Sequence, residues 1–225
     1  MSRRRFTRTA GACAGVAGAT GIAANAALVG YFVLGAPWEP GHHGRWEWLG
    51  PANDIVGSVS MAALIPVIAY LRHRVPGDRL LAALSVGGVL AAGAFAVAGP
   101  LLVAGVITLP TQFVVAGVGL PVIFGWLWRA NRAAARAGVL PRRTARFGDV
   151  IAIAALGATG LAGIGAALPA GSVGQYVVLA LVALPGLSAY LAFPVWQIAA
   201  GRTWWRDARS GAPTGVTPAL GAVPR

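Results

Sequence analysis

The sequence contains no lysine, only one cysteine and few charged residues. The last two shortages exclude classes of protein. Cys13, the single cysteine, excludes an intramolecular disulfide framework and any metal site built from several cysteines. Charged residues make up 11% of the 225 residues, whereas a soluble domain carries about 25%. Because 57% of the residues are hydrophobic and the mean hydropathy is +0.70, the composition predicts an integral membrane protein.

The few charges are strongly unequal in sign. The chain has eighteen arginines and six acidic residues, which gives a formal net charge of +12. A charge of this size suits nucleic acid in a soluble protein, but here the arginines form short clusters between apolar runs. This placement excludes nucleic acid as the expected partner and favours anionic lipid at the cytoplasmic face of the membrane.

The apolar runs predict an all-α polytopic membrane protein, a bundle of six transmembrane helices. About 20 apolar residues are needed to cross a bilayer as a helix. The expected spans cover residues 10–35, 55–71, 80–107, 112–128, 150–168 and 176–200. A basic cytoplasmic segment, residues 1–9, precedes this single domain of residues 10–200. Residues 201–225 are expected to form a flexible cytoplasmic tail, since the end of the chain is rich in proline and glycine.

The arginines also predict the orientation of these spans. Seventeen of them fall on one side of the expected membrane and only Arg45 falls on the other. Short loops rich in arginine stay in the cytoplasm, so both termini of a plasma-membrane protein are expected there. Tryptophans agree, because Trp46 and Trp48 flank the first outer loop whereas Trp126 and Trp204 lie at the expected inner boundary.

The first residues resemble a targeting signal. Ser2-Arg3-Arg4-Arg5-Phe6 followed by a mild apolar region is typical of twin-arginine export, and Ala24-Asn25-Ala26 offers a small-x-small cleavage pattern. The apolar run nevertheless continues past that pattern to residue 34, and five more spans follow. A retained membrane anchor is therefore favoured, with a cleaved signal as the alternative.

Three polar residues inside or beside the spans are candidates for ligand binding. Asn25 lies deep in the first span, where its amide needs a partner, so a hydrogen bond to another helix is expected and ligand contact is the alternative. Asp54 and Asp149 stand near the expected starts of the second and fifth spans. Capping of a helix amino terminus is the expected role of both, and ligand binding is again the alternative.

The first outer loop holds the densest group of polar residues. Glu39, His42, His43, Glu47 and Asp54 bring imidazole and carboxylate groups together, which suits zinc or acid–base catalysis in principle. Their spacing matches no helical zinc motif, and glycines and a proline interrupt the stretch. A solvated loop is therefore expected, with metal binding by the histidines or catalysis by Glu39, Glu47 and Asp54 as alternatives. No cofactor is predicted.

Small residues recur in the spans and bear on function. Gly11, Gly15, Ala19, Ala23 and Ala27 repeat every four positions, a pattern that permits close helix packing within the bundle or in a homodimer. Together with the scarcity of buried charge, it favours a non-enzymatic membrane subunit that binds a membrane-protein partner. The alternatives are a small permease or channel, suggested by prolines within the spans, and a membrane-embedded enzyme acting on a lipid or isoprenoid.

Overall fold

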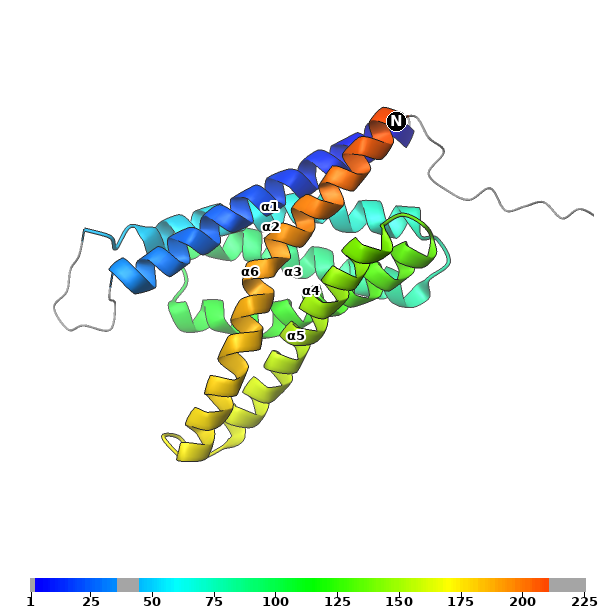
Figure 1. The fold of residues 1–225 in the computed structure, drawn as a ribbon. Helices are drawn as coiled ribbons and strands as arrows, with labels where there is room; N and C mark the ends of the chain where they lie inside the picture. Colours follow the sequence, from blue (N-terminus) through cyan, green and yellow to red (C-terminus); the bar gives the residue numbers. More distant parts are fainter. Residues whose placement is uncertain (1–2, 36–44, 211–225) are drawn as a thin grey trace, which may run out of the picture.

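The computed structural model describes residues 3–35 and 45–210, which form six long α-helices (Figure 1). Each helix is long and apolar enough to cross a membrane, and the described residues contain no strand, so the predicted six-helix fold is confirmed. The helices are α1 (Arg3–Leu34), α2 (Leu49–Arg74), α3 (Arg79–Val103), α4 (Leu109–Arg136), α5 (Arg142–Ala167) and α6 (Val173–Ser210).

Short turns reverse the chain between α2 and α6. Each of these four turns contains a glycine with a positive φ angle, which other residues adopt at a cost. The glycines are Gly77, Gly105, Gly138 and Gly171, with φ between 66° and 88°. Successive helices therefore run in opposite directions and pack side by side.

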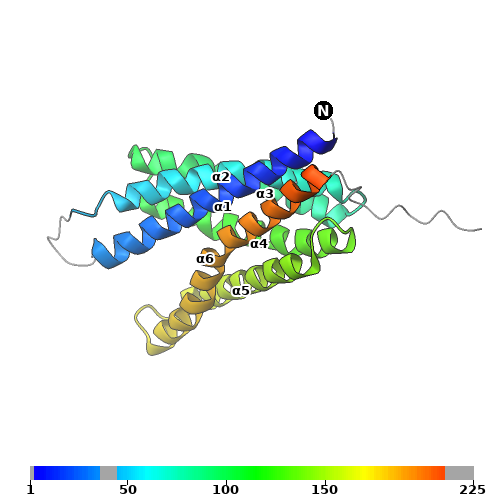
Figure 2. The ribbon, with the colours of Figure 1, turned by 45° about the horizontal axis from the view of Figure 1, so that its top comes forward.

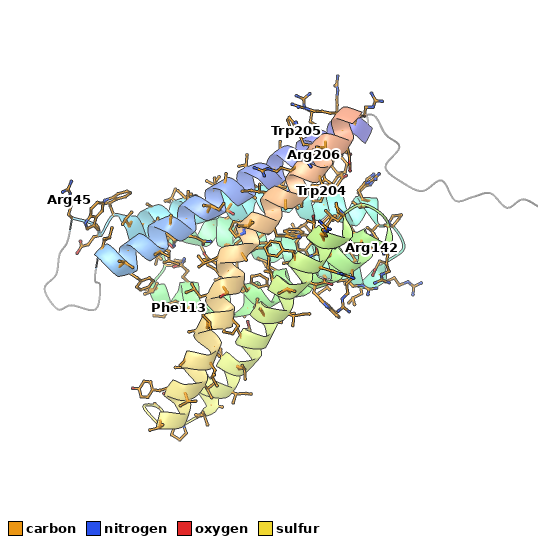
Figure 3. All side chains as sticks on the ribbon, viewed as in Figure 1. Arg45, Phe113, Arg142, Trp204, Trp205 and Arg206 are labelled. Atoms are coloured by element: carbon orange, nitrogen blue, oxygen red, sulfur yellow. The ribbon has the colours of Figure 1, made fainter. Side chains whose placement is uncertain are left out.

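The six helices form a closed ring. Each helix packs against its neighbours in the sequence, and α6 returns to pack against α1 (Figure 1). The start of α1 and the end of α6 consequently lie at one end of the molecule, which we call the basic end; the opposite end is the far end. Figure 3 shows Arg142 and Arg206 at the basic end, and Arg45 and Phe113 toward the far end.

Helix α6 changes its packing partner along its length. From Ala189 onward it contributes buried residues to the bundle, whereas none of residues 173–188 is buried. Residues 156–188, which we call the hairpin arm, diverge from α1 to α4 in both views (Figures 1 and 2). The two buried residues of the arm, Ala158 and Gly165, pack within it, against Gly186 and Val178. The bundle is thus closed toward the basic end and splayed toward the far end.

Aromatic side chains fill the closed half of the bundle. Trp126, Trp196 and Trp204 have no exposed surface, and the ring centroids of Tyr70 and Trp204 lie 4.8 Å apart. Trp126 and Trp204, which were expected at the membrane boundary, turn their rings into the core and not toward the surface of the bundle. Trp205 is only partly buried and lies 4.9 Å from the Arg8 guanidinium, as an interfacial residue can.

Two expected boundaries also differ from the structure. The third span was expected to reach residue 107, but α3 ends at Val103. The next helix begins at Leu109, and Pro110 lies in its first turn, where its missing N–H costs nothing. Residues 201–210 were expected in the tail but belong to α6. The buried Trp204 holds this last stretch in place, since its Nε1 donates a hydrogen bond to the Val139 carbonyl at 3.2 Å. The remainder of the expected tail lies outside the described residues.

Candidate functional site

Two polar contacts between helices lie in the splayed half of the bundle, and together they involve four different helices. Gln112 Nε2 of α4 donates a hydrogen bond to Asp54 Oδ1 of α2 at 3.1 Å. Asn25 Nδ2 of α1 donates to the Tyr190 carbonyl of α6 at 3.4 Å. Tyr190 in turn lies within electrostatic range of the Asp54 carboxylate. We call Asn25, Asp54, Gln112 and Tyr190 the far-end polar cluster.

Asp54 serves this cluster and does not cap α2. Helix α2 begins at Leu49, with Trp48 at the cap position and no side-chain cap hydrogen bond, so the expected capping role is wrong. The helix start was expected at Ile55, where the apolar stretch begins, but Leu49 to Asn53 are also helical. Asp54 is the sixth residue of the helix and is only partly buried. Its carboxylate instead accepts the hydrogen bond from Gln112 of the neighbouring helix α4.

Asn25 forms the predicted bond between helices. Its side chain is 7% exposed, and it bonds to α6 at Tyr190, just after the end of the hairpin arm at residue 188. Closer to the basic end, Gly18 and Gly21 of α1 lie directly against Ile198 and Pro194. Asn25 therefore lies where α6 leaves α1, at the base of the splayed half.

Asp149 also differs from the expectation. Helix α5 begins at Arg142, so Asp149 lies within its third turn and caps nothing. It pairs instead with Arg132 of α4, with 3.5 Å between Nε and Oδ2, while its Oδ1 is buried without a hydrogen bond. Arg132 also lies 4.5 Å from the Trp128 ring. This arrangement joins α4 to α5 and does not reach the far-end polar cluster.

The carboxylate that does cap a helix was missed. Asp78 precedes α3, and its Oδ1 accepts a hydrogen bond from the Leu81 backbone N–H at 2.9 Å. Arg129 Nη2 lies 2.8 Å from its other oxygen. The Pro76-Gly77-Asp78 turn before an apolar run is a recognisable start signal for a helix and could have identified Asp78.

The candidates of the first outer loop are not brought together by the described structure. Glu39, His42 and His43 lie outside the described residues, and Glu47 lies exposed in the turn before α2. In the part of the chain that the structure describes, no three His, Cys, Asp or Glu side chains gather as a metal site.

Two amide side chains lie fully buried in the closed half. Asn131 accepts a hydrogen bond from Trp196 Nε1 at 3.0 Å and donates one to the Leu127 carbonyl at 2.8 Å. Gln197, also without exposed surface, forms no side-chain hydrogen bond to any described residue. Gln197 lies within the expected sixth span, whereas Asn131 lies beyond the expected end of the fourth, where the surrounding arginines suggested a cytoplasmic loop.

The far-end polar cluster contains side chains that can donate and accept hydrogen bonds. It offers one carboxylate, two amides and one phenol, and no hydrogen bond joins the carboxylate to the phenol. Such groups can hold a polar or cationic moiety within a membrane. The chain matches no protein-family model, no curated protein and no solved structure.

Proposed function

We propose that this chain is a multi-pass protein of the cell membrane that works as a non-enzymatic subunit, with both termini in the cytoplasm. Its role is to bind a transmembrane helix of a partner protein against the hairpin arm. The observation that carries this proposal is that none of residues 173–188 is buried, although they belong to a helix of 38 residues. The seventeen arginines on one side support the orientation.

The arm has the composition of a segment that remains in hydrocarbon. No charged residue occurs between Val150 and Gly201. Leu181 and Leu184 are 63% and 75% exposed, so the arm presents apolar side chains to whatever surrounds it. Divergence from the bundle therefore leaves this surface in the bilayer.

Small residues on the arm permit a partner to approach closely. Helices associate in lipid through close packing, because burial of apolar surface gives no advantage there. Gly157, Gly160 and Gly163 have open space where a side chain would project. The same chain already uses this mode between α1 and α6, where a Cβ on Gly201 would lie 2.8 Å from the Gly11 carbonyl oxygen.

A bulky residue on the arm tests this proposal. Gly160→Leu fills the open face, and Gly93→Leu, at an equally open site on α3, is the matched control. The tagged chain is expressed in its native membrane, extracted in mild detergent and sized by native electrophoresis. We expect a complex larger than the monomer for the wild type and Gly93→Leu, and the monomer for Gly160→Leu.

Two tags separate a homodimer from a complex with another protein. Co-purification of differently tagged copies identifies a second copy as the partner, whereas its absence in an intact large complex identifies a different polypeptide. A wild-type chain that migrates as a monomer, or a Gly160→Leu complex of unchanged size, would refute the proposal.

The hydrogen bond between Gln112 of α4 and the Asp54 carboxylate of α2, with Tyr190 of α6 within electrostatic range, favours a small permease or channel as the second candidate. Prolines within the helices, such as Pro121 and Pro194, supply bends that such a protein uses. It ranks second because Trp126 and Trp196 fill the closed half. Flux of labelled choline into proteoliposomes, abolished by Asp54→Asn, would support it, and equal flux in protein-free vesicles would remove it.

A further inference from the structure

A groove opens at the basic end, between the end of α2 and the start of α3. Its volume is about 670 Å³, and Arg72 of α2 and Arg79 of α3 line it together with Ala83 and Val86 of α3. The turn between the helices contains Gly77 at φ 88°, which reverses the chain tightly enough to bring both arginines to one groove. The groove therefore combines guanidinium groups with an apolar helix surface.

The positive charge of this groove is not balanced within it. Asp78, the acidic residue of the lining, is occupied by the Leu81 N–H and by Arg129. Arg72 makes one long hydrogen bond, from Nη1 to the Val75 carbonyl at 3.5 Å. Arg79 is exposed and forms no hydrogen bond or ion pair with the described part of the chain. Both arginines retain donors for an anion.

The apolar wall runs from these arginines into the membrane-spanning part of α3. Val86 follows Arg79 by seven residues, which is about 10 Å along a helix. Its side chain is 63% exposed, and Leu90, one turn farther, is 70% exposed. An anionic group bound to Arg72 and Arg79 would thus lie at one end of the exposed apolar surface that Val86 and Leu90 form on α3.

We propose that this groove binds one anionic phospholipid, with the phosphate between Arg72 and Arg79 and an acyl chain along Ala83 and Val86. The charge complements a phosphate, and the position at the end of a membrane span suits a lipid headgroup. A free phosphate ion would use the arginines but not the apolar wall. The site is independent of the hairpin arm, which lies toward the opposite end of the molecule.

Native mass spectrometry of the purified full chain in neutral detergent tests this site. Phosphatidylglycerol and phosphatidylcholine are added separately, and the dissociation constant of the first bound lipid is measured. The wild type should prefer phosphatidylglycerol, and Arg72→Gln with Arg79→Gln should weaken it by about 5-fold for each arginine. The matched control, Arg142→Gln with Arg143→Gln, removes two exposed arginines from the same end and should leave the affinity unchanged.

A second variant separates a lipid from a phosphate ion. Ala83→Trp fills the apolar wall without removing charge, so it should weaken phosphatidylglycerol binding as well. Excess inorganic phosphate should not displace the lipid from the wild type. Equal affinity for the two lipids, an equal loss in the control, an unchanged Ala83→Trp variant, or displacement by inorganic phosphate would overturn the proposal.

Discussion

Replacing Gln197 with methionine should stabilise the folded bundle. Gln197 has no exposed surface, and neither its Nε2 nor its Oε1 forms a hydrogen bond with the described residues. A buried polar group without a partner costs about 1–3 kcal/mol. Methionine has nearly the same length and shape, so Gln197→Met removes this cost while it preserves packing.

The expected gain is at the lower end of that range. In a bilayer, the amide of a separated helix also lacks water, although it can find other partners there. We therefore expect the free energy of unfolding to rise by about 1 kcal/mol. Val195→Met, at a site on α6 that is 47% exposed, is the control for the effect of methionine itself and should change stability little.

Asn131 lies in the same core but, unlike Gln197, its side chain forms hydrogen bonds. Asn131→Leu removes the acceptor of the Trp196 Nε1 hydrogen bond and leaves that N–H buried without a partner. We expect a loss of about 1–2 kcal/mol. The assay is reversible unfolding in mixed micelles by titration with sodium dodecyl sulfate, followed by circular dichroism and tryptophan fluorescence. The two buried amides should thus give changes of opposite sign.

A destabilised Gln197→Met variant would refute this reasoning. It would mean that the Gln197 amide is engaged in the membrane, so that its removal loses a favourable interaction. Equal losses in Gln197→Met and Val195→Met would instead trace the effect to methionine on α6.

Two further predictions concern the cap of α3 and the contact of α1 with α6. The Leu81 N–H, and after it Arg129, hold the pKa of Asp78 below its ordinary value, with burial opposing them. Asp78→Asn should therefore destabilise the protein by about 1 kcal/mol at neutral pH. The difference should decrease as the pH falls below the ordinary pKa of aspartate toward the lowered one, in unfolding measured from pH 7 to pH 3. Gly201→Leu should prevent closure of the ring, because its Cβ would lie 2.8 Å from the Gly11 carbonyl oxygen, and the yield of folded protein by size-exclusion chromatography should fall several-fold.

Controls make both results decisive. Asparagine also caps helices, so Asp78→Asn removes the charge and keeps the cap; a difference as large at pH 3 as at pH 7 would contradict a role of that charge. Gly15→Leu introduces the same side chain on α1, where nothing lies within 4 Å of the added Cβ. Equal yields for Gly15→Leu and Gly201→Leu would show that the close contact is unimportant.

Hydropathy was sufficient to predict the six helices, because each must satisfy its own backbone in lipid. Their packing faces were harder to predict. The small residues expected every four positions on the first span do not all face neighbouring helices. Ala19 and Ala23 are exposed, whereas Ala17 and Ala24, which are not part of the series, are buried. Steps of four residues advance 40° beyond a full turn, so a long series drifts around the helix. The contacts of the partner helix decide which small residues are used.

The candidate site was predicted only in part. Asn25 was conspicuous because an amide deep in an apolar run needs a partner, and its bond to α6 was expected. Asp54 was identified, but its role was not, because the partner Gln112 is 58 residues away in the sequence. Pairings between distant helices depend on how the ring closes, and hydropathy carries no information on that arrangement.

The closure of the ring by its first and last helices has a consequence for biosynthesis. The ribosome synthesises α1 long before α6. The surface of α1 around Gly11 and Gly18 therefore has no α6 to pack against until translation is nearly complete. Chains terminated before Ala189 would retain five helices and residues 173–188 of the sixth, yet none of the buried residues of α6. In such chains the surface of α1 that normally packs against α6 would remain uncovered, and membrane proteases could recognise it.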